Sequence, residues 1–405
     1  MQTSRALTAL TVATLAVTLL PSAPAHACGA MLFEQHESRP GGMSDQEIFV
    51  GAMRDETLMV VSAGFAASDT REFAFLLPIP AVPAQVEDGA PAIFQVLQHG
   101  TSPRVFIETL TEGGGDDGGC GCGSADKAGA LGDGGRSTDV EVRDRGETET
   151  WEYVVVGGGG EDASVAEWLN AEGFTAPAAM ADSIDAYVAD GWLFFAARVK
   201  PTAGAGVLAP LQMHFPAVTA AELVVPIGIS AESLAPAGQL GITLYLWSVQ
   251  PLAPKNYALV NAADLQITAT SPTESDYETK FEAAAAEGSG QFVVEYADAF
   301  TAGNFDLWQT SATDAGVALD GDPTSFRDTL AGLVEGSTSG QLVRLRTRLT
   351  PAQLQDITFE ASAQPTTSNE HYVVYSSGGS SEAGLFAGGL FALLSLLAVW
   401  RGRQR

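Results

Sequence analysis

The three cysteines are the most chemically reactive residues of this sequence. Cys120 and Cys122 are separated by one glycine, and Cys28 lies far upstream. In an oxidising compartment we expect a disulfide, either between Cys120 and Cys122 or between one of them and Cys28. A Cys-x-Cys pair could also bind a soft metal, but a complete site needs about four ligands and no histidine is near in sequence. Unpaired thiols are the third alternative, and no metal site is predicted.

Three arginines alternate along one predicted strand, at Arg344, Arg346 and Arg348. Successive side chains of a strand point to opposite sides of its sheet, so these three share one face. On a chain so rich in carboxylates, we expect them to pair with acidic side chains of neighbouring strands. The alternative is a stripe that binds an anion.

Hydrolase machinery is hard to recognise in this sequence. None of the histidines lies in a His-Glu-x-x-His pattern or beside a nucleophile, and those outside the N-terminal segment are predicted at surface or loop positions: His36, His99, His214 and His371. Residues 336–340 are similar to a Gly-x-Ser-x-Gly elbow, but Thr338 stands where serine is required. The glycines at 157–160 are followed by Glu161 and Asp162, which would repel phosphate. No catalytic residue and no cofactor-binding residue is therefore predicted.

Two acidic pairs could offer oxygen ligands to calcium, namely Asp116 with Asp117 and Asp320 with Asp322. Neither pair completes the Asp-x-Asp-x-Asp-Gly loop with its distal glutamate. The chain has 49 acidic residues, so neighbouring carboxylates also arise by chance. Calcium is the one cofactor that the sequence leaves open.

The charge of the chain restricts its partners. The formal net charge is -29, and the middle of the chain is more acidic still, because four of the 20 basic residues lie in terminal segments that contain no Asp or Glu. Such a surface repels nucleic acid and anionic lipid headgroups. With 46% hydrophobic residues the chain can bury a substantial core, so we expect a globular protein without a nucleic-acid partner.

Residues 1–27 have the pattern of a secretory signal peptide. Arg5 supplies the positive start, an apolar stretch follows, and Ala25-His26-Ala27 fits the small-x-small cleavage rule. Cleavage between Ala27 and Cys28 would make Cys28 the first mature residue. A lipoprotein with an acylated Cys28 is the alternative, although such signals normally carry leucine where this chain has Ala25.

The C-terminus carries a second targeting pattern. Residues 376–382 form a Ser/Gly linker, residues 383–400 are apolar and uncharged, and residues 401–405 are basic. Eighteen helical residues span roughly 27 Å, which is just enough for a bilayer core. The arginines favour a cytoplasmic tail, so we expect one transmembrane helix that holds the ectodomain outside the cytoplasm, in the periplasm or at the cell surface. The pattern also resembles bacterial C-terminal sorting signals that a protease removes. The cysteine of the related myxobacterial signal is missing, however, and so is an LPxTG sequence. We therefore prefer a retained anchor.

Residues 28–375 have the pattern of an extracytoplasmic α+β domain, β-rich, with antiparallel strands and a few short helices. Apolar runs bounded by turn formers predict a β-meander over 46–50, 57–62 and 72–77, and further strands over 151–156, 192–199, 222–229, 241–250, 291–295 and 341–349. Helical periodicity predicts helices over 91–99, 163–171 (capped by Asp162), 178–189 and 323–335. Residues 111–149 are rich in glycine and acidic residues and predict a flexible insert, which contains Cys120 and Cys122.

Several of these segments occur in a recognisable order. They are Cys28-Gly29 after the signal, Phe-Ala-Phe-Leu-Leu-Pro-Ile-Pro at 73–80, Cys-Gly-Cys at 120–122, Ala-Tyr-Val-Ala-Asp-Gly-Trp at 186–192, Leu-Val-Val-Pro-Ile-Gly-Ile-Ser at 223–230 and Arg-Leu-Arg-Thr-Arg-Leu-Thr-Pro at 344–351. The ordered set resembles the bacterial family of exported proteins known as domain of unknown function 2330, over most of residues 28–365. Relatives often carry a second cysteine shortly after the first, where this chain has Met31-Leu32-Phe33, so a disulfide within that turn cannot form. The family has no assigned reaction, so the resemblance implies a fold and an exported location without a chemistry.

These features favour an exported, membrane-anchored cell-envelope protein whose ectodomain is a binding or structural module with another envelope component as partner. The alternatives are an envelope hydrolase that uses paired carboxylates and a calcium-dependent surface adhesin. A carboxyl with a raised pKa that faces a second carboxylate across a cleft would favour the hydrolase. A sheet face without such a cleft would favour the binding module.

Overall fold

The computed structural model describes most of the expected ectodomain. The described residues are 30–34, 45–52, 56–62, 73–110, 140–158, 164–172, 174–175, 178–200, 208–234, 236–332, 339–362 and 364–376. The predicted signal peptide, the apolar segment 383–400 and the tail 401–405 lie outside them. So do Cys28, Cys120 and Cys122.

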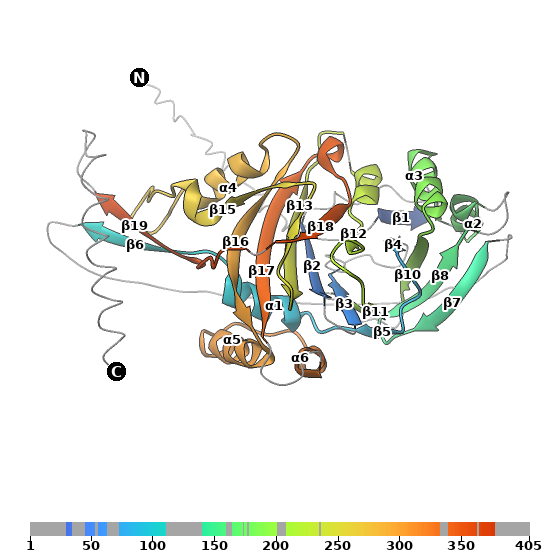
Figure 1. Ribbon diagram of the computed structural model, residues 1–405, viewed down its shortest axis with the longest axis horizontal. Helices are drawn as coiled ribbons and strands as arrows, with labels where there is room; N and C mark the ends of the chain where they lie inside the picture. The colour runs from blue at the N-terminus through green and yellow to red at the C-terminus, as the bar shows by residue number, and fades with distance from the viewer. Residues whose placement is uncertain are drawn as a thin grey trace, which may run out of the picture.

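An eight-stranded mixed sheet forms the middle of the molecule, in the order β15-β16-β17-β13-β2-β3-β11-β5 (Figure 1). Its strands are β2 Asp45–Ala52, β3 Glu56–Val61, β5 Gln85–Asp88, β11 Leu211–Pro216, β13 Leu240–Ser248, β15 Ala258–Asn261, β16 Gln291–Phe300 and β17 Gly340–Leu349. Most neighbours are antiparallel, as predicted, but β13 runs parallel to β2 and β15 runs parallel to β16. The predicted predominance of antiparallel strands is therefore confirmed, but the sheet is mixed, and the parallel pairs were not predicted because pairing between distant segments leaves no local pattern in the sequence.

A six-stranded antiparallel sheet has the order β7-β8-β10-β4-β1-β9. Its strands are β1 Ala30–Glu34, β4 Phe73–Ile79, β7 Glu141–Glu147, β8 Trp151–Gly157, β9 Phe174–Thr175 and β10 Leu193–Val199. The predicted meander is wrong in its third strand, since β2 and β3 pair with each other while β4 lies between β10 and β1. Phe75, Leu76 and Leu77 are all buried, so β4 has apolar side chains on both faces and suits the interior of a sheet covered on two sides.

Part of the segment predicted to be a flexible insert is a β-strand. β7, within the expected insert, pairs in antiparallel register with β8 at the edge of the six-stranded sheet. Its side chains are mostly exposed and polar, so the strand is held by backbone pairing, which the side-chain composition does not reveal. The rest of the insert, residues 111–139, lies outside the described residues.

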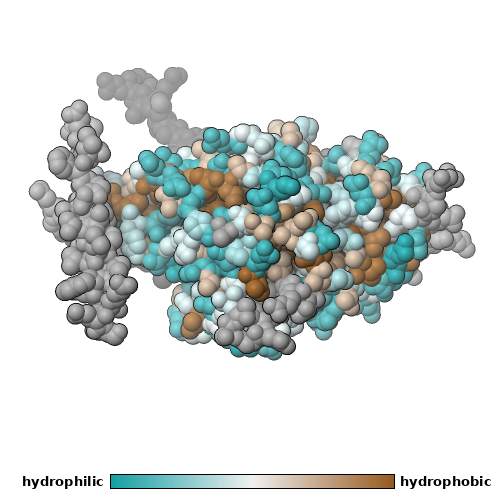
Figure 2. All heavy atoms as spheres, viewed as in Figure 1, coloured by the Kyte–Doolittle hydropathy of each residue, from teal (hydrophilic) through white to brown (hydrophobic). Residues whose placement is uncertain are grey.

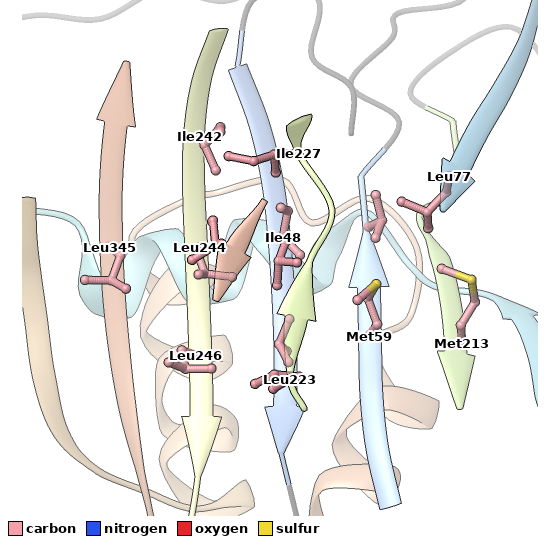
Figure 3. Packing of buried hydrophobic residues seen from close by; sticks show 14 of the residues in the cluster. Ile48, Met59, Leu77, Met213, Leu223, Ile227, Ile242, Leu244, Leu246 and Leu345 are labelled. Carbon is pink, nitrogen blue, oxygen red and sulfur yellow. The ribbon is translucent and has the colours of Figure 1, made fainter. Parts of the chain in front are cut away.

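The principal core lies between the two large sheets. Alternate side chains of the eight-stranded sheet, including Ile48, Met59, Leu244 and Leu345, point to one side, as Figure 3 shows. They pack against side chains of the six-stranded sheet and of a three-stranded sheet, β12-β18-β14 (Val224–Val225, Ile357–Ala361 and Leu252–Pro254). The opposite side of the eight-stranded sheet buries aromatic residues such as Tyr245 and Trp247 beneath helices.

Six α-helices cover the sheets of the described chain: α1 Ala92–Thr101, α2 Val165–Ala171, α3 Ala178–Ala189, α4 Tyr277–Ala285, α5 Ala302–Asp314 and α6 Thr324–Gly332. Short 3-10 turns add Gly228–Ser233, Ala262–Leu265 and Pro351–Gln353. Helices α1, α5 and α6 cover the aromatic side of the eight-stranded sheet, whereas α2 and α3 cover the six-stranded sheet at the other end of the molecule (Figure 1).

Two predicted elements need correction. Ser164, and not Asp162, caps α2, because its side chain accepts a hydrogen bond from the Glu167 amide. The strand predicted over 222–229 is reduced to the two residues of β12, and a 3-10 turn begins at Gly228. In the described part of the chain, no helix combines the length and the apolar character needed to cross a membrane. The predicted transmembrane segment lies outside that part.

Candidate functional site

A two-stranded parallel ribbon leaves the body of the molecule at one end (Figure 1). It consists of β6, Arg104–Leu110, directly after α1, and β19, Glu370–Ser376, at the end of the described chain. Neither strand was predicted. The ribbon is joined to the body through a cluster of polar and charged side chains at its base. We call it the root cluster, and its members are Glu47, Ser102, Tyr245, Tyr277, Glu278, Glu295, Arg344, Arg346, Asn369 and His371.

Arg344 is the centre of the root cluster. Its side chain is 8% exposed, and its Nε donates to Oε2 of Glu295 at 2.6 Å. Its NH1 donates to Ser102 Oγ at 2.8 Å and to the Tyr245 hydroxyl at 3.2 Å. These partners come from β16, the end of α1 and β13, so one guanidinium ties three separate elements together.

Glu295 is the matching buried anion, with a fully buried side chain on the strand next to Arg344. The Tyr277 hydroxyl donates to its Oε1, and NH1 of Arg346 lies 3.6 Å from the same oxygen. Burial, together with the nearby Glu295 carboxylate, raises the pKa of Tyr277 well above its usual range, so Tyr277 remains a donor. A carboxylate with this many donors is strongly held in place.

The predicted pairing of the arginine stripe with carboxylates of neighbouring strands is confirmed for Arg344, whereas Arg346 has its closest carboxylate on a helix. Arg344 pairs with Glu295 on the neighbouring strand, and Arg346 forms a bidentate pair with Glu278 of α4 at 2.8 and 3.0 Å. The Arg346 guanidinium also lies over the Phe281 ring, 4.0 Å from its centroid. Arg348 follows on the same face and is half-buried. In Arg344 and Arg346 the groups that could bind an external anion are therefore engaged by the protein itself.

The ribbon is fastened to the end of α1 by Asn369. Its Nδ2 donates to the carbonyl of Ser102 at 2.8 Å, and its own carbonyl accepts from the Arg104 amide at 2.7 Å. Ser102 in turn contacts Arg344, so a continuous chain of hydrogen bonds leads from the ribbon to the buried ion pair.

His371 fills the inner face of the ribbon at its base. It is 9% exposed and stacks on Tyr277 with ring centroids 6.1 Å apart. No described residue gives its Nε2 a hydrogen bond. Burial lowers the pKa of His371. The negative charge of Glu295 raises it by a smaller amount, so the folded protein favours the neutral imidazole.

A depression of about 350 Å³ lies beside the root cluster, at the C-terminal end of α1. It is lined by Gln95, Gln98, His99, Ser102, Arg104 and Val317. Each polar side chain of this lining already forms a hydrogen bond within the protein, for example Gln98 with Glu47 and His99 with Ser311. The depression is therefore part of the packing of α1 and offers few uncommitted groups to a ligand.

The carboxyl with a raised pKa is found elsewhere, at Asp356. Burial is the main cause, and hydrogen bonds from the Tyr187 hydroxyl at 2.6 Å and the Gly228 amide at 2.8 Å oppose it. These bonds join α3 to the segment before β18. Among the described residues, Asp356 faces a tyrosine and a backbone amide and not a second carboxylate, which is not the arrangement that would favour a hydrolase.

Two of the described histidines, His214 and His371, are not the surface or loop residues that were predicted, whereas His99 is partly exposed. His99 lies in α1, His214 in β11 and His371 in β19, and the last two are largely buried. Each ring nitrogen of His214 contacts a glutamate, Nδ1 with Glu56 and Nε2 with Glu87 at 3.4 Å. The prediction failed because a polar residue inside a strand keeps the alternating pattern while its partners come from other strands. His36 lies outside the described residues.

Of the acidic residues considered for calcium, Asp322 uses its carboxylate within the fold and Asp320 uses its backbone amide. Asp322 accepts hydrogen bonds from the Thr324 amide and hydroxyl at 3.0 and 2.6 Å, at the start of α6. The Asp320 amide donates to Gln95 Oε1. Within the described ranges, no three His, Cys, Asp or Glu side chains converge as metal ligands. Asp116, Asp117 and the predicted disulfide cysteines lie outside those ranges, as does Thr338.

Glu295 is the residue of the root cluster whose burial the sequence indicates. It is the one acidic residue within the apolar start of β16, Gln-Phe-Val-Val-Glu-Tyr-Ala, and a charge there needs a buried partner. The burial of Tyr277, Glu278 and His371 is not indicated by the sequence. These residues lie in short polar segments that have the composition of a protein surface.

The described chain is thus a β-rich protein with two large sheets, mixed strand directions and several short helices. The model of a family described as uncharacterized protein conserved in bacteria (DUF2330) matches residues 22–338, which is most of the chain. The chain belongs to this family, and the predicted resemblance is confirmed.

Among solved structures, two of a mutated baculovirus P35 after caspase cleavage are similar to this chain in part. They are 12% and 13% identical to it, with TM-scores of 0.29 and 0.28, and the matches cover 54% and 53% of this chain and 76% and 73% of the viral protein. Likeness at this level carries no conclusion about function. No curated protein matches the chain.

Proposed function

We propose that this protein is exported, cleaved between Ala27 and Cys28, and anchored in the membrane by residues 383–400. Residues 28–375 then form a binding or structural module of the cell envelope, outside the cytoplasm. The partner of this module is another envelope component or the membrane itself.

The observation that carries the proposal is the position of β19, the strand that precedes the apolar segment in the sequence. β19 leaves the body as half of an exposed ribbon, and the apolar segment begins only seven residues after its last residue, Ser376. The proposed anchor is therefore attached to a projecting part of the fold and not to its core. This arrangement lets a transmembrane helix enter the bilayer without disturbing the sheets.

Support for membrane insertion comes from the sequence of the segment. Residues 383–400 contain no charged residue and are followed by Arg401, Arg403 and Arg405. A run of this length spans a bilayer core as a helix, and arginines favour the cytoplasmic side. Support for a binding role comes from the ribbon, where aromatic side chains are exposed to solvent.

The topology can be tested with the full chain expressed in a bacterial host. We expect protease added to intact spheroplasts to digest the ectodomain while a fragment with the basic tail remains in the membrane. An arginine at the centre of the segment, Leu394→Arg, costs about 3 kcal/mol of insertion free energy and should move chain into the soluble exported fraction. Ser395→Ala is the matched control and should leave the chain in the membrane. Complete protection of the ectodomain in spheroplasts would contradict the proposal.

A further inference from the structure

The ribbon of β6 and β19 has open edges. Each strand pairs with the other, and neither pairs with a third strand within the described residues. A two-stranded ribbon by itself is only marginally stable in water. Open edges joined to exposed apolar side chains mark a surface that meets a partner.

The outer face of the ribbon carries two aromatic rings beside the charged side chains of Arg104, Glu108 and Glu370. The register places Phe106 opposite Tyr372, and their rings stack with centroids 5.1 Å apart. Phe106 is 43% exposed, Tyr372 66%, and the neighbouring Val374 39%. Among the described residues, Phe106 and Tyr372 are the two aromatic residues whose side chains are largely exposed to solvent. Apolar residues are visible on the surface toward this end of the molecule in Figure 2.

The inner face of the ribbon is already occupied by the body. His371 stacks on Tyr277, and Val105 packs against the apolar cluster formed around α4. The base of the inner face is therefore covered, and these contacts together with Asn369 fix how the ribbon joins the body.

The length of chain beyond the ribbon limits what that partner can be. Six residues, 377–382, separate Ser376 from the apolar segment. Fully extended, six residues reach at most about 20 Å, and the polar layer of a bilayer is itself several ångströms thick. If the segment is inserted, the end of the ribbon is held close to the bilayer surface.

We infer that the outer face of the ribbon rests on the bilayer, with Phe106 and Tyr372 in the interfacial layer of zwitterionic phospholipid. The inference rests on the proposed membrane anchor. Aromatic rings with an apolar body and a polar edge are suited to this layer. Among the charged neighbours, Arg104 lies opposite Glu370 in the register, and the Tyr372 hydroxyl donates to Glu370 at 2.9 Å. The strong negative charge of the chain disfavours anionic headgroups as the partner.

Site-specific photo-crosslinking can identify what covers this face. Full chain in which p-benzoylphenylalanine replaces Tyr372 is reconstituted into vesicles of palmitoyl-oleoyl phosphatidylcholine, and the irradiated product is analysed by mass spectrometry. The replacement is itself aromatic, so the stack on Phe106 is largely kept, and the unfolding midpoint of the variant checks the fold. The matched control carries the same group in place of Leu307 on α5, which is 68% exposed and is not part of the ribbon.

We expect phospholipid adducts at position 372 to be several-fold more frequent than at position 307. A product of twice the chain mass would assign the ribbon to a second copy of the chain, and a crosslink within one chain would assign it to another segment; either overturns the inference. Equal lipid adducts at both positions, or no adduct at 372, overturn it as well. If the chain fails to float with the vesicles, the anchor itself is contradicted. A chain that floats without adducts at 372 contradicts only the ribbon contact.

Discussion

Nε of Arg344 lies 2.6 Å from Oε2 of Glu295, and both side chains are almost completely removed from water. The two residues belong to neighbouring strands of the eight-stranded sheet, and their shared network reaches the end of α1 and the base of the β6–β19 ribbon. This ion pair lies beneath the part of the molecule that we place at the membrane and is connected to it through Ser102 and Asn369.

Removing one partner of this pair should strongly destabilise the protein. Arg344→Met leaves the Glu295 carboxylate buried without its main partner, and we expect a loss of about 3–5 kcal/mol in the free energy of unfolding, measured by urea denaturation. Arg344→Met combined with Glu295→Leu should recover part of the loss, because no buried charge is left alone. Arg143→Met at an exposed pair with Glu141 is the control and should change little. A double variant less stable than Arg344→Met would contradict this account.

His371 should make stability depend on pH. Burial lowers its pKa in the folded protein, so the unfolded chain binds a proton more readily. Its contribution to stability is present at neutral pH and is lost as the pH falls through the ordinary histidine value of about 6.5 toward the folded value. His371→Phe keeps a ring against Tyr277 and removes the titration. Between about pH 7 and about pH 5 the unfolding midpoint of the parent should therefore fall more than that of His371→Phe.

The opposite trend is expected at Asp356. Burial raises its pKa, so the folded state favours the protonated carboxyl, and the contribution of this group falls as the pH rises through the folded value. In Asp356→Asn the amide oxygen can still accept from Tyr187 and Gly228 without a buried charge. The variant should gain stability relative to the parent between about pH 3 and about pH 7. Asp356→Leu loses both hydrogen bonds and should be destabilised by about 1–3 kcal/mol at either pH. A parallel pH profile for parent and Asp356→Asn would be inconsistent with this prediction.

Gly100 marks the close approach of α1 to α5. A Cβ at this position would lie 2.1 Å from Cδ2 of Trp308, so Gly100→Ala requires the indole or the helix to move. We expect a loss of about 1–3 kcal/mol, measured as a lower midpoint of chemical unfolding. Gly332→Ala, where an added Cβ meets no atom within 4 Å, is the matched control and should leave the midpoint nearly unchanged. Equal effects of both substitutions would show that the Trp308 contact does not limit position 100.

The sequence was sufficient for elements with a strong local pattern. The alternating strand of Arg344 and Arg346 and the helix Ala178–Ala189 were both predicted, and so was the pairing of those arginines with carboxylates. The partners themselves were not predicted. Glu295 lies 49 residues before Arg344, and Tyr245 lies 99 residues before it, and no local pattern records which distant strands become neighbours.

The ribbon and its root could not be predicted for a different reason. β6 and β19 are separated by more than half of the chain, and each is short and half-exposed. α4 buries only Tyr277, Phe281 and Ala285, so its composition is that of a polar surface segment. The structure of β6, β19 and α4 depends on contacts among these three elements, and those contacts form only when the whole chain is folded.

The most direct test of the central claim is the mass and location of the protein made from the intact gene. We predict a membrane-bound species that comprises residues 28–405, which begins at Cys28 and retains the apolar segment; added mass at its N-terminus would identify acylation of Cys28. A soluble species that retains residues 1–27 would contradict export and anchoring together. An exported species that ends before residue 383 would contradict the permanent anchor and identify the segment as a sorting signal.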